Sequence, residues 1–326
     1  MCLSLTEKIY GCFAALYHKR WDSRGGWRAS VPVISVGNIT VGGNGKTPFV
    51  IELVRVLNEN FPELAEPNRI AVLSRGYGRK FREMCVVETD TDFLRSGDEP
   101  LLIKRAYPSS LVISYAKRVV SARIAVEKFG ARVILLDDGF QHRPLARDID
   151  LVMLDSEQPF HNGRLLPAGR LRERPSALKR ATAFVSVGGG EEVAKLAAEF
   201  DKPIFRARET SPFETWQARP EEKAFLLTGI ARPERVRSFL EQSEIDIVGH
   251  KQFRDHHEFS ASDLYKVSED AAKSGATVVM TTSKDRIRIP SWQGSLPIVE
   301  IPYQLTISEQ KSFVSLLKTA ILPDAV

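Results

Sequence analysis

The chain has 326 residues, of which 43% are hydrophobic and 27% are charged, and its formal net charge is +5. This length suits about two domains, and the composition excludes a disordered or membrane-spanning protein, because no apolar run reaches the roughly 18–20 residues that a spanning helix needs. The positive charge favours anionic partners such as nucleotides, phosphorylated substrates, nucleic acid or an acidic membrane surface, without choosing among them.

Residues 3–21 carry apolar side chains at helical spacing, and we predict an amphipathic helix there. The apolar stripe consists of Leu5, Ile9, Phe13, Leu16 and Tyr17. Two interpretations remain open from these residues alone. Either the helix packs on its own domain, or it lies on an anionic membrane with the stripe in the lipid.

An apolar strand-like run at residues 31–36, a glycine-dense turn and a helical run at residues 49–54 follow one another. The glycines of the turn let backbone N–H groups approach phosphate oxygens. Lys46 is placed to reach the β- and γ-phosphates, and Thr47 offers a hydroxyl to Mg²⁺. The match to G-x-x-x-x-G-K-[ST] is imperfect, because Thr40 stands where the first glycine belongs. The predicted nucleotide-binding residues are Thr40, Val41, Gly42, Gly43, Asn44, Gly45, Lys46 and Thr47.

Strand-like and helical runs then alternate along the chain. Strands are predicted at residues 70–73, 85–87, 111–114, 133–136, 149–154 and 184–187, and helices at 101–107, 119–129 and 191–200. This alternation predicts a doubly wound, mainly parallel α/β sheet of the P-loop NTPase type, with ligands at the carboxyl ends of its strands.

A proline- and charge-rich stretch at residues 211–222 precedes a second series of elements. Its predicted strands are 224–227, 245–248, 277–280 and 298–301, and its predicted helices are 233–241, 261–273 and 308–321. We therefore predict three parts: an N-terminal helical segment at 1–28, a P-loop domain at 29–214, and a smaller α/β domain at 215–326.

Acidic residues end two of the predicted strands. Asp137 and Asp138 follow one buried run, where a P-loop enzyme holds Mg²⁺ or its bound water. Asp155 ends a second run of nearly the same form. Spacing favours the first pair without excluding the second, and either acid could instead cap the next turn.

Asp98 and Glu99 precede an apolar helical run. Asp98 suits the N-cap position, with Glu99 in the first turn. An acid at this place could also orient and deprotonate an attacking hydroxyl group, and the two roles are compatible.

Two adjacent histidines, His256 and His257, lie between acids just before a predicted helix. They could bind Zn²⁺, belong to a solvated loop, or supply a catalytic histidine between the domains. Arginine- and glycine-rich segments at residues 74–79 and 162–173 suit recognition of phosphate and sugar hydroxyl groups.

Taken together, these segments closely resemble the tetraacyldisaccharide 4′-kinases, or lipid A 4′-kinases, of Gram-negative bacteria. The matching segments run in family order over nearly the whole chain: Val-Gly-Asn-Ile-Thr-Val-Gly-Gly-Asn-Gly-Lys-Thr-Pro (36–48), Ser-Arg-Gly-Tyr-Gly-Arg (74–79), Gly-Asp-Glu-Pro (97–100), Leu-Asp-Asp-Gly-Phe-Gln-His (136–142), Leu-Pro-Ala-Gly-Arg-Leu-Arg-Glu (166–173), Asp-His-His (255–257) and Thr-Thr-Ser-Lys-Asp (281–285).

The resemblance implies transfer of the γ-phosphoryl group of ATP, with Mg²⁺, to the 4′-hydroxyl of tetraacyldisaccharide 1-phosphate in lipid A biosynthesis. It also implies peripheral attachment to the cytoplasmic face of the inner membrane. The expected partners are thus this lipid and an anionic membrane surface, with no nucleic acid and no obligate protein partner. An acylated substrate favours the interfacial interpretation of residues 3–21.

The resemblance also implies roles for individual residues. Asp98 is implied as the base and His256 as its assistant, with Lys46 and Asp138 as further catalytic residues. The implied metal site is Thr47, Glu99, Asp137 and Asp138, which decides against Asp155. The implied disaccharide or phosphate contacts are Tyr77, Arg118, Gln141, His142, Arg172 and Glu173.

Two positions depart from the family pattern. Asn44 replaces the usual threonine between the loop glycines, and Ser283 replaces the usual glutamate, which leaves the role of Lys284 open. The alternative hypothesis is a P-loop NTPase that acts as a switch or a metallochaperone-like module. A nucleic-acid-binding protein is a third possibility that rests on the basic charge alone.

Overall fold

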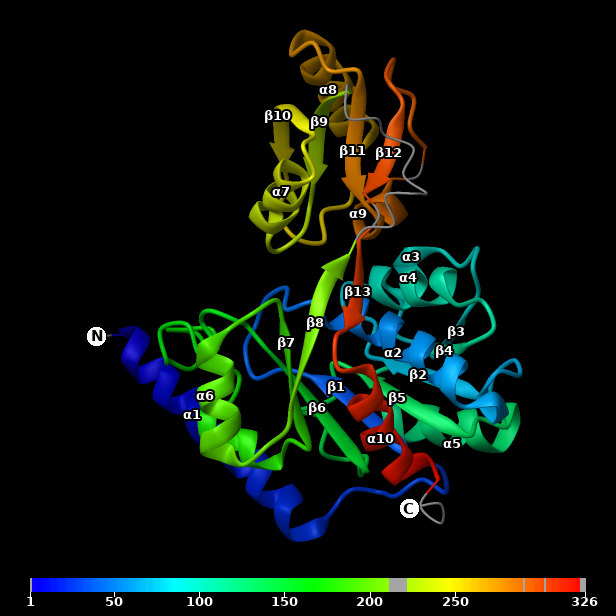
Figure 1. The fold of residues 1–326 in the computed structure, drawn as a ribbon, viewed down its shortest axis with the longest axis vertical. Helices are drawn as coiled ribbons and strands as arrows, with labels where there is room; N and C mark the ends of the chain where they lie inside the picture. Colours follow the sequence, from blue (N-terminus) through cyan, green and yellow to red (C-terminus); the bar gives the residue numbers. More distant parts are fainter. Residues whose placement is uncertain (1, 211–221, 290, 302, 323–326) are drawn as a thin grey trace.

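The structure, a computed structural model, describes residues 2–210, 222–289, 291–301 and 303–322. Within these residues the strands form a nine-stranded and a four-stranded sheet, which lie one above the other in Figure 1. The stretch predicted to separate the domains, 211–222, falls outside the described residues except for its last position.

The large sheet has the strand order β13-β8-β7-β6-β1-β5-β2-β4-β3. Its strands are β1 (Val33–Gly37), β2 (Ile70–Ser74), β3 (Cys85–Val87), β4 (Leu111–Ser114), β5 (Val133–Asp137), β6 (Ile149–Leu154), β7 (Ala183–Val187), β8 (Ile204–Thr210) and β13 (Gln304–Ile307). Neighbouring strands pair in parallel, except that β3 is antiparallel to β4 and β13 is antiparallel to β8. The predicted doubly wound, mainly parallel α/β fold is confirmed.

Helices cover both faces of this sheet, because alternate residues of its buried strands point to opposite sides. The helices of this part are α2 (Lys46–Asn60), α3 (Phe93–Ser96), α4 (Asp98–Ala106), α5 (Arg118–Phe129), α6 (Glu191–Phe200) and α10 (Gln310–Ile321), with short 3₁₀ turns η1 (Pro62–Leu64) and η2 (Pro175–Arg180). On one face, Phe49 of α2 and Phe313 of α10 pack edge to face with their ring centroids 6.1 Å apart. On the other face, α5 packs on Ile134 and Leu136.

The small sheet is parallel throughout, in the order β10-β9-β11-β12. Its elements are β9 (Lys223–Thr228), α7 (Pro233–Gln242), β10 (Asp246–Gln252), α8 (Ala261–Lys273), β11 (Val278–Thr282), α9 (Ser283–Arg288) and β12 (Ile298–Ile301). Helix α8 begins with a capping box, in which the side chains of Ser260 and Asp263 each bond the other's backbone N–H. Apolar residues of α8 and α7 fill separate cores on the sheet.

The C-terminal part of the chain corrects the predicted domain 215–326. Strand β13 pairs with β8 in the large sheet, and α10 packs into the core of that sheet. Figure 1 shows β8 leading toward the small sheet and β13 returning beside it. The return is stabilised by burial of Leu305, Ile307 and Phe313.

Helix α1 (Cys2–Arg24) exposes the predicted apolar stripe instead of burying it. The exposed fractions are 62% for Leu5, 49% for Ile9, 69% for Phe13, 59% for Leu16 and 40% for Tyr17. The opposite side of α1 faces the protein, where Tyr10 and His18 contact Arg172 and Glu173. Among the described residues, no helix is long and apolar enough to cross a membrane.

Candidate functional site

A cleft of about 1330 Å³ lies at the carboxyl ends of strands from both sheets. The segments after β1, β2 and β5 line it from the large sheet, and those after β9, β10 and β11 line it from the small sheet. The predicted site residues that line it are Val41, Gly42, Gly43, Asn44, Gly45, Lys46, Thr47, Tyr77, Glu99, Arg118, Asp137, Asp138, Gln141, His142, Arg172 and His256. Three predicted residues are not in its lining: Thr40, Asp98 and Glu173.

The phosphate loop connects β1 to α2 at the floor of this cleft. Gly45 is the residue before α2 and has φ of 76°, a conformation that side chains with a Cβ seldom adopt. The two unusual residues of the loop bond each other, because the Asn44 amide donates to the Thr40 hydroxyl oxygen at 2.9 Å. Thr40 and Asn44 thus hold the loop from within while its backbone N–H groups and the N-terminus of α2 remain available to an anion.

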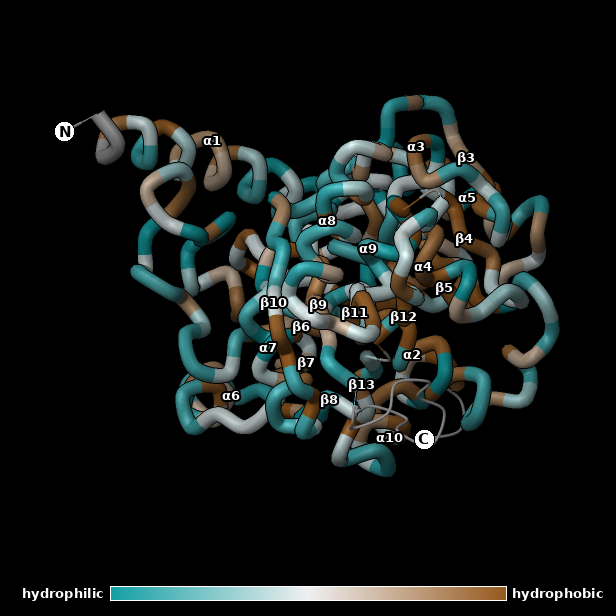
Figure 2. Tube along the Cα trace, turned by 90° about the horizontal axis from the view of Figure 1, so that it is seen from above, coloured by the Kyte–Doolittle hydropathy of each residue, from teal (hydrophilic) through white to brown (hydrophobic). Residues whose placement is uncertain are grey.

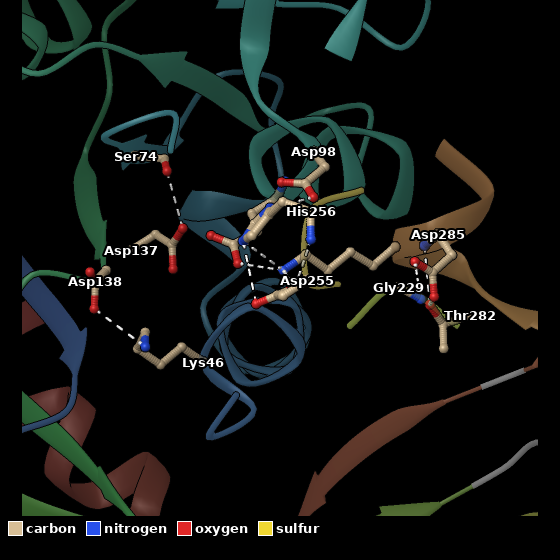
Figure 3. Close-up of polar contacts among 12 residues, drawn as sticks. Lys46, Ser74, Asp98, Asp137, Asp138, Gly229, Asp255, His256, Thr282 and Asp285 are labelled. Carbon is tan, nitrogen blue, oxygen red and sulfur yellow. Dashed lines mark hydrogen bonds and ion pairs between the residues drawn. The ribbon is translucent and has the colours of Figure 1, made fainter. Parts of the chain in front are cut away.

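Lys46 extends from the start of α2 toward the end of β5 (Figure 3). Its Nζ lies 3.4 Å from Asp138 Oδ1 and 3.2 Å from Asn38 Oδ1. Arg172 Nη1 donates to both oxygens of Asp138, at 2.9 and 2.8 Å. Burial raises the pKa of Asp138, but the charges of Lys46 and Arg172 outweigh burial and hold that pKa below its usual range. The carboxylate is therefore ionised and balanced by two cations.

Asp137 lies beside the phosphate loop because β1 and β5 are neighbours, with Val36 opposite Asp137 in the register. Its Oδ2 accepts a hydrogen bond from Ser74 at 3.1 Å, whereas its Oδ1 is buried without a partner among the residues that the structure describes. Burial raises the pKa of Asp137, and the nearby carboxylates of Glu99 and Asp138 raise it further. An unpaired buried carboxylate oxygen at this position fits a divalent cation.

The side chains of the site do not form a complete metal site by themselves. Among the described residues, no group of three or more histidine, cysteine, aspartate or glutamate side chains could hold one. Mg²⁺ at nucleotide sites takes one or two carboxylates together with phosphate oxygens and water. The acidic end of β5 therefore fits a cation that arrives with a nucleotide.

Asp98 and His256 meet across the two parts of the protein (Figure 3). Asp98 Oδ2 lies 2.9 Å from His256 Nδ1. The prediction that Asp98 is the N-cap is wrong by one residue: Gly97, with φ of 91°, occupies that position, and Asp98 is the first residue of α4. This shift frees Oδ2 for His256, while Oδ1 accepts from the Glu99 N–H at 2.9 Å.

The environment of Asp98 favours its ionised form. Asp98 is only 4% exposed, and burial by itself raises the pKa of its carboxyl group. The hydrogen bond from His256 and the charges of Lys284 and Arg288 outweigh burial and lower the pKa of Asp98. His256, which lines the cleft, separates Asp98 from it. The pair is thus a buried carboxylate behind a histidine at the cleft surface.

Lys284 on α9 joins this cluster, and the sequence left its role open. Its Nζ lies 3.1 Å from Glu99 Oε1, 3.4 Å from His256 Nε2 and 3.7 Å from Asp255 Oδ1. Burial lowers the pKa of Lys284, but these carboxylates and Asp98 outweigh burial and raise that pKa above its usual range. A permanent cation therefore stands between the acids of α4 and the histidine of the second sheet.

Arg288 and Asp285 support the cluster from behind and were not predicted. Arg288 is 2% exposed, and its Nη2 donates to Asp285 Oδ1 at 2.5 Å and to Gly229 O at 3.0 Å. Its Nε lies 3.6 Å from Asp98 Oδ2. Because Arg288 and Asp285 are buried and paired with each other, removing either side chain leaves an uncompensated charge in the interior.

Three of the predicted sugar and phosphate contacts, Gln141, Arg172 and Glu173, lie together beside α1. Gln141 Nε2 donates to Glu173 Oε1 at 2.9 Å, and Arg172 Nη1 contacts Gln141 Oε1 at 3.2 Å. His142 is held neutral, because burial and nearby arginine charges lower its pKa to about 3. Tyr77 is 66% exposed and lies against His256, with the ring centroids 5.1 Å apart.

Helix α1 is bound to these same segments through its inward side. Tyr10 donates to the Arg172 carbonyl oxygen at 3.0 Å, and His18 Nε2 lies 3.1 Å from Glu173 Oε2. Arg118, another of the predicted contacts, donates from Nη1 to the Asp138 carbonyl oxygen at 3.1 Å. The helix therefore forms one wall of the cleft beside the arginine-rich segments.

Two alternatives from the sequence are excluded by where their side chains point. Asp155 is absent from the cleft lining and forms an ion pair with Arg232 while accepting from backbone N–H groups. His257 turns away from His256 and contacts Asp263, with its Nε2 3.1 Å from Oδ2. The two histidines thus face different partners, and the Zn²⁺ interpretation is wrong.

Comparison with known proteins gives consistent results. A model of the family described as tetraacyldisaccharide-1-P 4′-kinase matches residues 1–322. The tetraacyldisaccharide 4′-kinase of Syntrophus aciditrophicus is 38% identical over 315 residues, covering 87% of this chain and 83% of that protein. The enzyme of the same name from Desulfotalea psychrophila is 38% identical over 299 residues, covering 85% and 84%.

A solved structure shares the fold over nearly the full length. The crystal structure of LpxK from Aquifex aeolicus, described as a complex with ATP, has a TM-score of 0.77 and 27% identity. The match covers 98% of each chain.

Proposed function

This chain belongs to the tetraacyldisaccharide-1-P 4′-kinase family, and from that premise we propose that it transfers the γ-phosphoryl group of ATP to the 4′-hydroxyl of tetraacyldisaccharide 1-phosphate. It is thus an ATP-dependent lipid kinase of lipid A biosynthesis. The observation that carries the assignment is that one cleft is lined by a phosphate loop and, across from it, by His256, whose Nδ1 contacts the buried Asp98.

ATP is bound by the loop from Thr40 to Thr47, with Lys46 on its β- and γ-phosphates. Lys46 now faces Asp138, and the phosphates replace that carboxylate as its nearest anion when the nucleotide enters. Thr47, Glu99, Asp137 and Asp138 are the residues that would hold Mg²⁺, which supplies positive charge to the phosphate oxygens. The free Asp137 Oδ1 is the feature that supports this set.

Asp98 is the base for the 4′-hydroxyl, and His256 of the second sheet, which lines the cleft, relays the proton to it: the ring takes the hydroxyl proton on Nε2 and gives its Nδ1 proton to Asp98. Proton transfer requires the acceptor to be ionised, and the lowered pKa of Asp98 meets that requirement. Because the two residues come from opposite parts of the protein, the pair is complete only when these parts lie together. Phosphoryl transfer then needs little beyond an aligned hydroxyl group and a charge clamp.

The residues that bind the disaccharide and its phosphate are Tyr77, Arg118, Gln141, His142 and Arg172, and Glu173 supports them. Arg172 and Arg118 offer cations to the 1-phosphate, and the neutral His142 offers a hydrogen bond without adding charge. Glu173 is buried at 4% exposure and lies outside the cleft lining, so it acts through Gln141, which it holds.

Family membership decides against the switch-type or metallochaperone-like NTPase, and no nucleic acid partner is needed. The direct test is transfer of labelled γ-phosphate from ATP to tetraacyldisaccharide 1-phosphate in mixed micelles. Labelled lipid confirms the proposal. ATP hydrolysis without any labelled lipid would refute the proposal and favour the switch-type NTPase.

Lys284→Met tests the cation between the two parts of the site. We expect kcat to fall by up to about 100-fold, because the loss of this charge leaves Glu99 and His256 without a common partner. Lys284→Arg should recover part of the rate. The matched control is Lys251→Met, since Lys251 pairs with Asp270 on the surface. Equal rates for wild type and Lys284→Met would show that Lys284 has no part in catalysis.

We propose that the protein attaches peripherally to the cytoplasmic face of the inner membrane through α1. The exposed stripe from Leu5 to Leu16 supports this proposal, because monomeric proteins seldom expose aligned apolar side chains without a partner. Lys8, Lys19 and Arg20 are exposed on the same helix and suit anionic headgroups.

Changing the stripe alone tests this attachment. Phe13→Ser combined with Leu16→Ser should lower binding to anionic vesicles by roughly tenfold or more, measured by co-sedimentation, because two apolar side chains no longer enter the lipid. Deletion of residues 1–24 should have a larger effect but also removes the Tyr10 and His18 contacts to the site. Undiminished vesicle binding by both variants would contradict the interfacial helix.

A further inference from the structure

The segment between β2 and β3, residues 75–84 and hereafter the β2–β3 loop, presents apolar side chains to solvent beside the cleft. Phe81 is 51% exposed and Met84 is 37% exposed. Neither of these two large apolar side chains takes part in the proposed catalytic steps or in the proposed substrate contacts. Exposed apolar side chains grouped on a loop indicate a surface that contacts something else.

The loop is held in shape from within. The Arg79 guanidinium donates to the carbonyl oxygens of Glu83 at 2.8 Å, Arg82 at 3.0 Å and Ser114 at 2.8 Å. The Lys80 N–H donates to Leu94 O at 2.8 Å. Phe81 therefore lies on an ordered turn, because the backbone groups of the residues on both sides of it form hydrogen bonds within the protein.

The charge around Phe81 is positive. Lys80 and Arg82 flank it in the chain and are exposed, and the Arg95 guanidinium carbon lies 5.9 Å from its ring centroid. Glu83 is the acidic residue of the segment 75–84, which carries four basic ones. Glu258 also faces the loop and pairs with Lys80 at 2.7 Å. An apolar tip surrounded by cations is complementary to a bilayer with anionic headgroups.

The loop and α1 lie toward the same side of the molecule (Figure 2). In Figure 2, α1 and the loop beside β3 lie along the same upper margin of the molecule. Tyr17 of α1 and Tyr77 of the loop both line the cleft. The cleft thus reaches both elements, and a lipid in a membrane would approach it between them.

We propose that the β2–β3 loop is a second membrane-contacting element, which inserts Phe81 and Met84 into an anionic bilayer while α1 rests on the same surface. The inference rests on the proposed lipid kinase function, since that function requires the cleft to meet a membrane-held acceptor. Two separate contacts fix the orientation of the cleft over the bilayer more firmly than one helix does.

The test uses the full chain and sucrose-loaded vesicles of phosphatidylcholine with phosphatidylglycerol, or of phosphatidylcholine alone. Phe81→Ser combined with Met84→Ser should lower partition to the anionic vesicles by roughly tenfold or more. Arg82→Gln should lower it about fivefold on the anionic vesicles and leave binding to the neutral ones unchanged. The matched control is Tyr265→Ser, because Tyr265 is 66% exposed on α8, far from α1 in Figure 1.

A second measurement follows insertion directly. Phe81→Trp should show a blue-shifted emission with anionic vesicles and quenching by brominated lipid chains, each relative to wild type, whereas Tyr265→Trp should show neither. Equal partition of Phe81→Ser/Met84→Ser and wild type, or a Phe81→Trp emission that vesicles leave unchanged, overturns the proposal.

Kinase activity in detergent micelles separates this inference from the proposed function. The Phe81→Ser/Met84→Ser variant should phosphorylate the micellar acceptor at the wild-type rate. If wild type makes no labelled lipid, the proposed function fails, and the vesicle comparison still decides whether the loop binds membranes. If all variants make product and bind vesicles alike, the function stands and the loop proposal falls.

Discussion

Asp98→Asn is expected to lower kcat for lipid phosphorylation by about 10²–10⁴-fold, the usual contribution of a positioned general base. The amide keeps the size of the carboxylate and can still bond His256, but it cannot take a proton from the acceptor hydroxyl. Because Asp98 does not line the cleft, KM for ATP should change little. Initial rates of labelled phosphate transfer in mixed micelles, at several ATP concentrations, measure both parameters.

The matched control for this substitution is Asp270→Asn. Asp270 pairs with Lys251 on the surface of the small sheet's domain, so its loss should leave both parameters unchanged. Thermal unfolding of each variant separates a catalytic loss from a folding defect. Asp98→Asn with wild-type kcat would remove Asp98 as the base and leave His256 to be tested in the same way.

The phosphate loop and the acidic end of β5 were predictable because their chemistry is local. A strand, glycines, Lys46 and Thr47 are contiguous in the sequence, and parallel pairing of β1 with β5 brings Asp137 to the loop. Such patterns require only that neighbouring residues take the conformation that they prefer. The doubly wound fold follows from the same local alternation of strands and helices.

The return of the chain to the large sheet was not predictable in this way. Strand β13 is only four residues long, and it pairs with β8, about a hundred positions earlier in the chain. The Ile307 N–H also donates to Glu52 Oε1 at 3.1 Å, another contact between distant segments. No local periodicity encodes such pairings. The helix that follows β13 was therefore assigned to the wrong domain.

The supporting residues of the site escaped prediction for a related reason. Lys284 and Glu99 are 185 positions apart, and Arg288 reaches Asp98 from the same short helix α9. Their sequence context shows only a charged helical turn. Asp98 itself illustrates the limit of local rules, since Gly97 takes the N-cap position and turns the carboxylate toward His256.

Lys46→Ala should lower kcat by about 10²–10³-fold, because it removes a preorganised charge from the transferring phosphoryl group. KM for ATP should rise as well, since we propose that Lys46 contacts the phosphates already in the ground state. The expected change in both kcat and KM for ATP differs from the result for Asp98→Asn, for which only kcat falls. The combination therefore distinguishes a residue that binds the nucleotide from one that acts on the acceptor.

Lys195→Ala is the matched control for Lys46→Ala, because Lys195 is exposed and pairs with Glu192 on the surface of α6. The loss of Lys46 also removes one of the cations beside Asp138, so unfolding is measured beside the rates. Wild-type kinetics for Lys46→Ala would contradict the phosphate-loop assignment. A variant that no longer binds ATP, yet keeps vesicle binding, would instead show that the nucleotide site and the membrane surface are separate features of one fold.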